Sequence, residues 1–86
     1  MSKLAVRAAV AARGEVARQL TALLVVRPSH GATFVQISAH LYRVPLRTLD
    51  RELQWLRRAG VVRTIRDRAR YGDSCPRWEL CHMVPR

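Results

Sequence analysis

One stretch decides the fold of this chain: Val44–Val62, which reads VPLRTLDRELQWLRRAGVV. Its leucines recur at helical spacing and form one apolar stripe, which is typical of a helix packed against a core. They are Leu46, Leu49, Leu53 and Leu56. Gly60 follows the last of them, at the place where helices often end in a left-handed residue. The stretch therefore predicts a helix over residues 45–59 that ends at a glycine, followed by a β-branched strand.

The remaining faces of this helix carry basic and polar side chains. The candidate binding residues on them are Arg47, Thr48, Asp50, Arg51 and Gln54. A helix with one apolar stripe and one basic face can pack on a small core while it offers donors to base edges and phosphates. The alternative is an ordinary solvated helix face.

The string Arg47–Leu53, followed by Leu56 and by Ala59-Gly60-Val61, resembles the recognition helix of winged helix-turn-helix proteins of the DeoR and MarR types. The resemblance covers residues 33–82. It implies a three-helix core plus a β-hairpin wing, and it implies binding to double-stranded DNA.

Two positions of this chain depart from the family pattern. Arg43 stands in the turn before the helix, where members usually have glycine, and Pro45 stands where they usually have serine or a similar cap. Proline at the first helical position is acceptable, because its missing N–H would be unpaired there in any case.

The N-terminal half supplies the other helices that such a fold needs. Apolar periodicity predicts helical structure over 3–13 and 15–26, either as one helix bent at Gly14 or as two helices that meet there. Thr33 is the expected cap of the next helix, which runs to about Leu41. A loop separates it from the preceding helix.

The C-terminal part predicts the wing. Residues 61–66 and 77–82 read as two strands, and the loop between them is basic. A fold of this order is mainly helical with a small hairpin, of the α+β class. The arginines of the turn and wing expected to contact DNA are Arg43, Arg66, Arg68, Arg70 and Arg77. The negative potential of the DNA backbone and minor groove attracts such arginines.

The predicted organisation has three parts. Residues 1–14 form an N-terminal helix and a candidate dimerisation arm, residues 15–82 form the winged-helix domain, and residues 83–86 form a flexible tail. Leu4, Val6, Ala9 and Val10 make an apolar stripe on the first helix. We expect this stripe to build a homodimer; the alternative is that the helix folds back on its own domain.

The charge balance points to an anionic partner. The chain has 86 residues, with sixteen Lys and Arg against six Asp and Glu, and a formal charge of +10. Nucleic acid is the first candidate and a membrane surface the second. A GC-rich genome would also favour arginine, but codon choice does not explain so few acids. No apolar run approaches the roughly 20 residues that span a bilayer, so no membrane span is expected. Of the two candidates we expect nucleic acid and not a membrane to be the partner.

Catalytic and metal chemistry find little support. The chain has no paired-carboxylate site, no nucleophile motif and no Gly-rich phosphate loop, so we expect neither an enzyme nor a cofactor. Cys75 and Cys81, even with the three histidines, lack the usual zinc spacing, so no metal is expected. Two free thiols suit a reducing cytoplasm.

These observations predict a sequence-specific, double-stranded DNA-binding protein, acting as a small transcriptional regulator in the cytoplasm at the nucleoid. The alternative is a winged-helix interaction module, an inhibitor or adaptor that docks on an acidic protein partner or a nucleoprotein complex. RNA binding is a third reading, but single-stranded RNA readers usually display several aromatic residues, and this chain has few.

Overall fold

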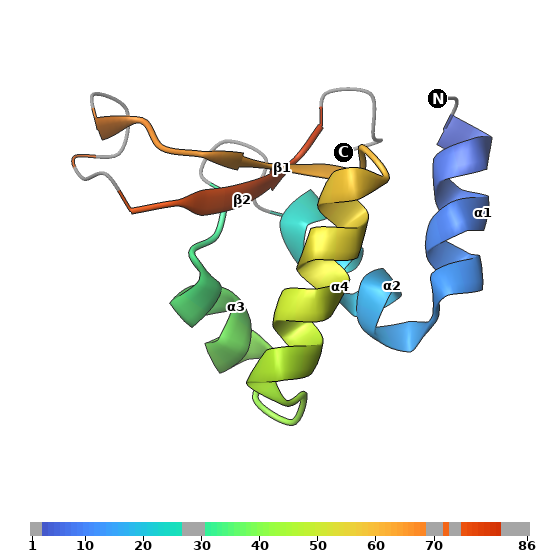
Figure 1. The fold of residues 1–86 in the computed structure, drawn as a ribbon, viewed down its shortest axis with the longest axis horizontal. Coiled ribbons are helices and arrows are strands. Elements are labelled where there is room, and N and C mark those ends of the chain that lie inside the picture. The colour runs from blue at the N-terminus through green and yellow to red at the C-terminus, as the bar shows by residue number, and fades with distance from the viewer. Residues whose placement is uncertain (1–2, 27–30, 69–71, 73–74, 82–86) are drawn as a thin grey trace.

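The computed structural model describes residues 3–26, 31–68, 72 and 75–81. In these residues four helices are followed by a two-stranded antiparallel hairpin (Figure 1). The elements are α1 (Lys3–Arg13), α2 (Glu15–Val25), α3 (Phe34–His40), α4 (Leu46–Arg58), β1 (Val62–Ile65) and β2 (Arg77–Leu80). The predicted class, mainly helical with a small hairpin, is confirmed. Of the two possibilities at Gly14, the structure has two separate helices that meet there.

Local sequence signals explain where α3 begins. The Thr33 hydroxyl accepts a hydrogen bond from the Gln36 backbone N–H at 3.2 Å, and the Gln36 side chain accepts one from the Thr33 N–H at 3.0 Å. This reciprocal pair satisfies two N–H groups that a helix start would otherwise leave unpaired. The prediction that Thr33 caps this helix is confirmed.

The two ends of α4 also follow from the sequence. Gly60 has a φ of +79°, its N–H bonds the Arg57 carbonyl at 3.1 Å, and the Val61 N–H bonds the Leu56 carbonyl at 2.9 Å. This pair of bonds is the Schellman ending that glycine favours, as predicted. At the other end Pro45 is the N-cap rather than the first helical residue, so the helix starts one residue later than expected.

A short segment before α3 pairs with strand β2 of the hairpin. Val62 pairs with Leu80 in the β1–β2 register, and Ala32 forms an isolated antiparallel bridge with Trp78. The Ala32 N–H donates to the Trp78 carbonyl at 2.9 Å, and the Trp78 N–H donates back at 2.7 Å. A Cβ at Gly31 would lie 2.8 Å from the Trp78 carbonyl oxygen, so only glycine permits this approach. The sequence predicted a loop before α3 and missed this pairing.

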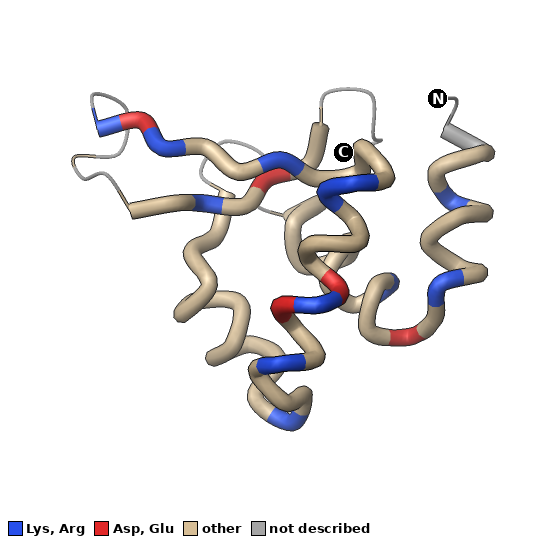
Figure 2. Tube along the Cα trace, viewed as in Figure 1, with Lys and Arg blue, Asp and Glu red and all other residues tan. Residues whose placement is uncertain are grey.

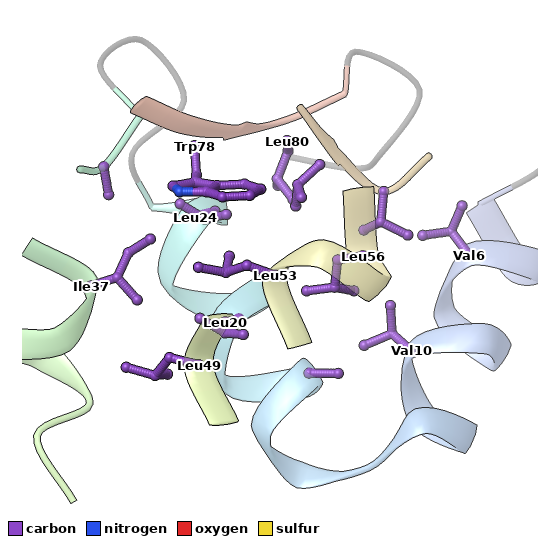
Figure 3. Close-up of a cluster of buried hydrophobic side chains, with 14 residues drawn as sticks. Val6, Val10, Leu20, Leu24, Ile37, Leu49, Leu53, Leu56, Trp78 and Leu80 are labelled. Atoms are coloured by element: carbon purple, nitrogen blue, oxygen red, sulfur yellow. The ribbon is translucent and has the colours of Figure 1, made fainter. Parts of the chain in front are cut away.

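The core lies between α2, α4 and the hairpin (Figure 3). Leu49, Leu53 and Leu56 of α4 are fully buried in it, but Leu46 is 60% exposed. The prediction that Leu46 belongs to the buried stripe is therefore wrong. Periodicity fixes the angle of a side chain around a helix, but it does not tell whether the core extends to that end of the helix.

The first helix belongs to the same core. Val6 and Val10 of α1 are only 3% and 5% exposed, and both point toward the centre of the molecule (Figure 3). Two of the four stripe residues that motivated the homodimer, Val6 and Val10, are thus covered by the chain itself, as in the alternative set out above. The oligomeric state stays a prediction, because a single chain does not test it.

Candidate nucleic-acid interface

The side of α4 that points away from the core carries a line of polar side chains. Arg47, Arg51, Gln54 and Arg58 follow one another at intervals of four, three and four residues, which places them on one stripe. We call these four residues the outer face of α4. Its arginines are exposed and Gln54 is half-buried. Figure 2 shows the basic positions spread along this helix. The arrangement offers planar guanidinium donors to a surface lying against the helix.

Thr48 and Asp50 lie off this stripe, on opposite flanks of the helix. Thr48 is half-buried and lies seven residues before Trp55, which packs against the core. Asp50 is exposed on the other flank. Of the five residues predicted on this helix, Arg47, Arg51 and Gln54 therefore lie on the outer face, and Thr48 and Asp50 lie off it.

A groove lies between the Asp50 flank of α4, the start of α3 and the hairpin. Its volume is about 400 Å³. The described residues that line it are Thr33, Phe34, Val35, Asp50, Gln54, Arg57, Thr64, Arg66, Cys75, Pro76 and Trp78. The groove thus joins residues predicted on the helix with one predicted on the wing.

Arg57 also lines this groove, and it was not among the residues predicted to bind DNA. It lies in the last turn of α4, where a cation also interacts favourably with the helix dipole. It stands seven residues after Asp50 and three after Gln54, so it shares their side of the helix. This spacing in the sequence could have predicted that Arg57 lies beside Asp50 and Gln54.

The predicted wing arginines differ in exposure. Arg66 and Arg68, which follow β1, are exposed, whereas Arg77, the first residue of β2, is half-buried. Arg70 lies outside the described residues. The two exposed side chains are therefore the ones that the structure offers to a partner.

The α3–α4 turn closes without a glycine. The Val44 N–H donates to the Leu41 carbonyl at 2.9 Å, and no described residue other than glycine has a positive φ. Arg43 is exposed, and its guanidinium carbon lies 5.6 Å from the centroid of the Tyr42 ring. The departure from the family pattern at Arg43 thus costs no backbone strain in the turn.

Two of the chain's few acids are buried and paired with arginine. Glu52 accepts a hydrogen bond from Arg13 Nε at 2.7 Å, and Glu79 accepts one from Arg63 Nε at 2.9 Å across the hairpin. Sequence reasoning missed both pairs. These carboxylates belong to residues that are only 8% and 3% exposed, and each neutralises the arginine with which it pairs.

Three further observations concern membrane-spanning helices, metal-binding clusters and the cysteines. Within the described residues, no helix combines the length and apolar character needed to cross a membrane. In the same part of the chain, no three His, Cys, Asp or Glu side chains gather where they could hold a metal ion. Cys75 is exposed and Cys81 is half-buried, and neither belongs to a disulfide.

Neither the models of known protein families, nor curated protein sequences, nor solved structures gave a match to this chain. Its function must therefore be inferred from its own residues and their geometry.

Proposed function

We propose that this chain is a winged-helix protein that binds double-stranded DNA in a sequence-dependent way and acts as a small transcriptional regulator. The outer face of α4 carries the proposal, because it aligns Arg47, Arg51 and Gln54 on a helix whose opposite side is fixed in the core. A helix of this diameter fits the major groove of B-form DNA.

The order of the elements supports the same reading. In the proposed fold, α2, α3 and α4 form the three-helix core, α4 is the recognition helix, and the β1–β2 hairpin is the wing. The two-way bond between Ala32 and Trp78 ties the start of α3 to the hairpin. Helix and wing are then held in a fixed relation, as a protein that contacts DNA with both requires.

The side chains suggest a division of roles. Arginine makes bidentate contacts to guanine and glutamine to adenine, so Arg47, Arg51 and Gln54 are the proposed base-reading residues. Arg66 and Arg68 are proposed to contact phosphates, which position a protein on DNA without reading its sequence. The formal charge of +10 suits such a polyanion.

Fluorescence anisotropy with a random 20-base-pair duplex, repeated across salt concentrations, tests the proposal. We expect binding whose logarithm falls linearly with the logarithm of salt, with a slope of about −0.9 for each phosphate contacted. A single-stranded RNA of equal length serves as the competitor. Absence of duplex binding at low salt, or preference for the RNA, would contradict the proposal.

A second candidate function, an interaction module for an acidic protein, is favoured by one observation. Three large apolar side chains of α3, the turn and α4 are exposed, namely Val35 (75%), Tyr42 (73%) and Leu46 (60%). Exposed apolar groups rimmed by charge are common where proteins associate. The same titration separates the two functions, because an acidic-protein module without DNA affinity would leave the duplex unbound.

A further inference from the structure

The end of α1 is fastened to α4 through one arginine. Arg13, the last residue of α1, donates from Nε to Glu52 Oε2 at 2.7 Å, and its guanidinium carbon lies 5.0 Å from the centroid of the Trp55 ring. The Glu52 side chain is 10% exposed and that of Arg13 is 30% exposed. This arrangement combines a charge-assisted hydrogen bond with a cation–π contact in a partly desolvated place.

A second arginine lies at the edge of the same carboxylate. Arg51 Nη2 is 3.9 Å from Glu52 Oε1, and the Arg51 side chain is 64% exposed. The two arginines are therefore unequal partners of Glu52: Arg13 is close and sheltered, whereas Arg51 is distant and mostly in water. Arg51 is also one of the proposed base-reading residues on the outer face of α4.

We infer that Arg13 is a positioning residue for Arg51. By neutralising Glu52, Arg13 leaves the Arg51 guanidinium directed outward, where it can meet DNA. A buried carboxylate that loses its partner is strongly unfavourable. Without Arg13, Glu52 draws Arg51 inward as its replacement partner, and the outer face loses a donor. This inference rests on the proposed function, since it assumes that Arg51 contacts DNA.

Helix α1 thereby influences binding from outside the proposed interface. Figure 1 shows α1 and α3 on opposite sides of α4, with the hairpin extending on the side of α3. Arg13 belongs to α1 and is not among the described residues that line the groove between α3, α4 and the hairpin. A loss of DNA affinity on changing Arg13 would therefore have to pass through α4.

Duplex affinity of the full chain tests the inference, with Arg7→Ala as the matched control. Arg7 is exposed on the same helix, so its replacement removes the same charge without touching Glu52. We expect Arg13→Ala to weaken binding by about tenfold more than Arg7→Ala does, which is the size of one lost base contact. Equal losses in the two variants would overturn the inference.

A double-mutant cycle separates positioning from a general structural effect. In an Arg51→Ala background, Arg13→Ala should cost no more affinity than Arg7→Ala. Adding Glu52→Gln to Arg13→Ala should restore affinity, because a neutral amide no longer attracts Arg51. Two results would overturn the inference. One is that Arg13→Ala still weakens DNA binding more than Arg7→Ala does in the Arg51→Ala background. The other is that Glu52→Gln does not restore the DNA affinity of Arg13→Ala.

Arginine side-chain NMR provides a measurement that does not depend on DNA. The Arg51 Nε–H should exchange rapidly with water in the unaltered chain and more slowly in Arg13→Ala, where it joins Glu52. If the chain binds no duplex, the proposed function fails, yet this signal still reports whether Arg51 is captured. Unchanged exchange at Arg51 in folded Arg13→Ala contradicts the capture.

Circular dichroism confirms that each variant is folded before either measurement. If Arg13→Ala does not fold, Arg13→Lys replaces it, because lysine keeps the charge but lacks the planar fork and stacks less well on an aromatic ring. A smaller loss of affinity is then expected, again only while Arg51 is present. A loss that is equal with and without Arg51 overturns the inference in this variant too.

Discussion

The buried leucines of α4, which we call its inner face, and the outer face of the same helix differ in what surrounds their side chains. Leu49, Leu53 and Leu56 have no exposed surface, whereas Arg47 and Arg51 stand mainly in water. A side chain in a close-packed core contributes to stability through contacts on every side, while a solvated side chain contributes little. One helix therefore separates residues that stabilise the fold from residues available for binding. Changes among the buried leucines should leave DNA binding intact, and changes on the outer face should leave stability intact.

Glu52 is the place where this separation is incomplete. It is buried like the leucines, yet it pairs with Arg13 of α1 and approaches Arg51 of the outer face. A charge on the inner side needs a partner, and here the nearest candidates come from two different parts of the molecule. We therefore expect a change at Glu52 to affect both stability and binding, whereas changes elsewhere along α4 should affect one of the two.

The largest effect is expected from Leu53→Ala. Leu53 is fully buried in the middle of the inner face, so its truncation removes apolar contacts and leaves a cavity. The free energy of unfolding should fall by about 2–5 kcal/mol, measured by urea denaturation. Duplex affinity, measured where the variant is still folded, should stay within about twofold of the unaltered chain. A large loss of affinity in folded protein would show that the faces are not separable.

The opposite pattern is expected for changes on the outer face. Arg47→Ala should weaken binding to a selected DNA site by about 1–3 kcal/mol and relax sequence preference, with stability changed by less than about 0.5 kcal/mol. Arg68→Ala, a matched loss of charge on the hairpin side, should weaken binding to all sequences alike. Selection of binding sites from a random library with each variant measures the preference. If Arg68→Ala alters the preferred site and Arg47→Ala does not, the two assignments are reversed.

The sequence predicted elements whose signals are local. The capping residues Thr33 and Gln36 are three positions apart, and Gly60 directly follows the helix that it ends, so both boundaries followed from neighbouring residues. Helix and strand positions followed from apolar periodicity for the same reason. Tertiary proximity has no such local signal. The bridge between Ala32 and Trp78 could not be inferred from one sequence, because nothing near either residue identifies its partner.

The candidate site divides in the same way. Periodicity was sufficient to place Arg47, Arg51 and Gln54 on one side of α4. The ion pair between Arg13 and Glu52 joins residues 39 positions apart, so a single sequence held no sign of it. A glutamate among arginines is expected on the surface, since a carboxylate is rarely buried unless it is paired. Only the folded arrangement reveals which arginine serves it.

The smallest effect is expected from Leu46→Ala, which sharpens the comparison at the boundary between the two faces. Leu46 has the spacing of the inner leucines but the exposure of the outer arginines, at 60%. Its truncation should change the free energy of unfolding by less than about 0.5 kcal/mol, whereas the matched variant Leu49→Ala should lose about 2–5 kcal/mol. Urea denaturation at two protein concentrations measures both free energies of unfolding.

A loss of stability in Leu46→Ala near that of Leu49→Ala, present only at the higher concentration, would mean that a second copy of the chain covers Leu46. The homodimer would then use the α3–α4 end of the molecule rather than α1, whose valines are already buried.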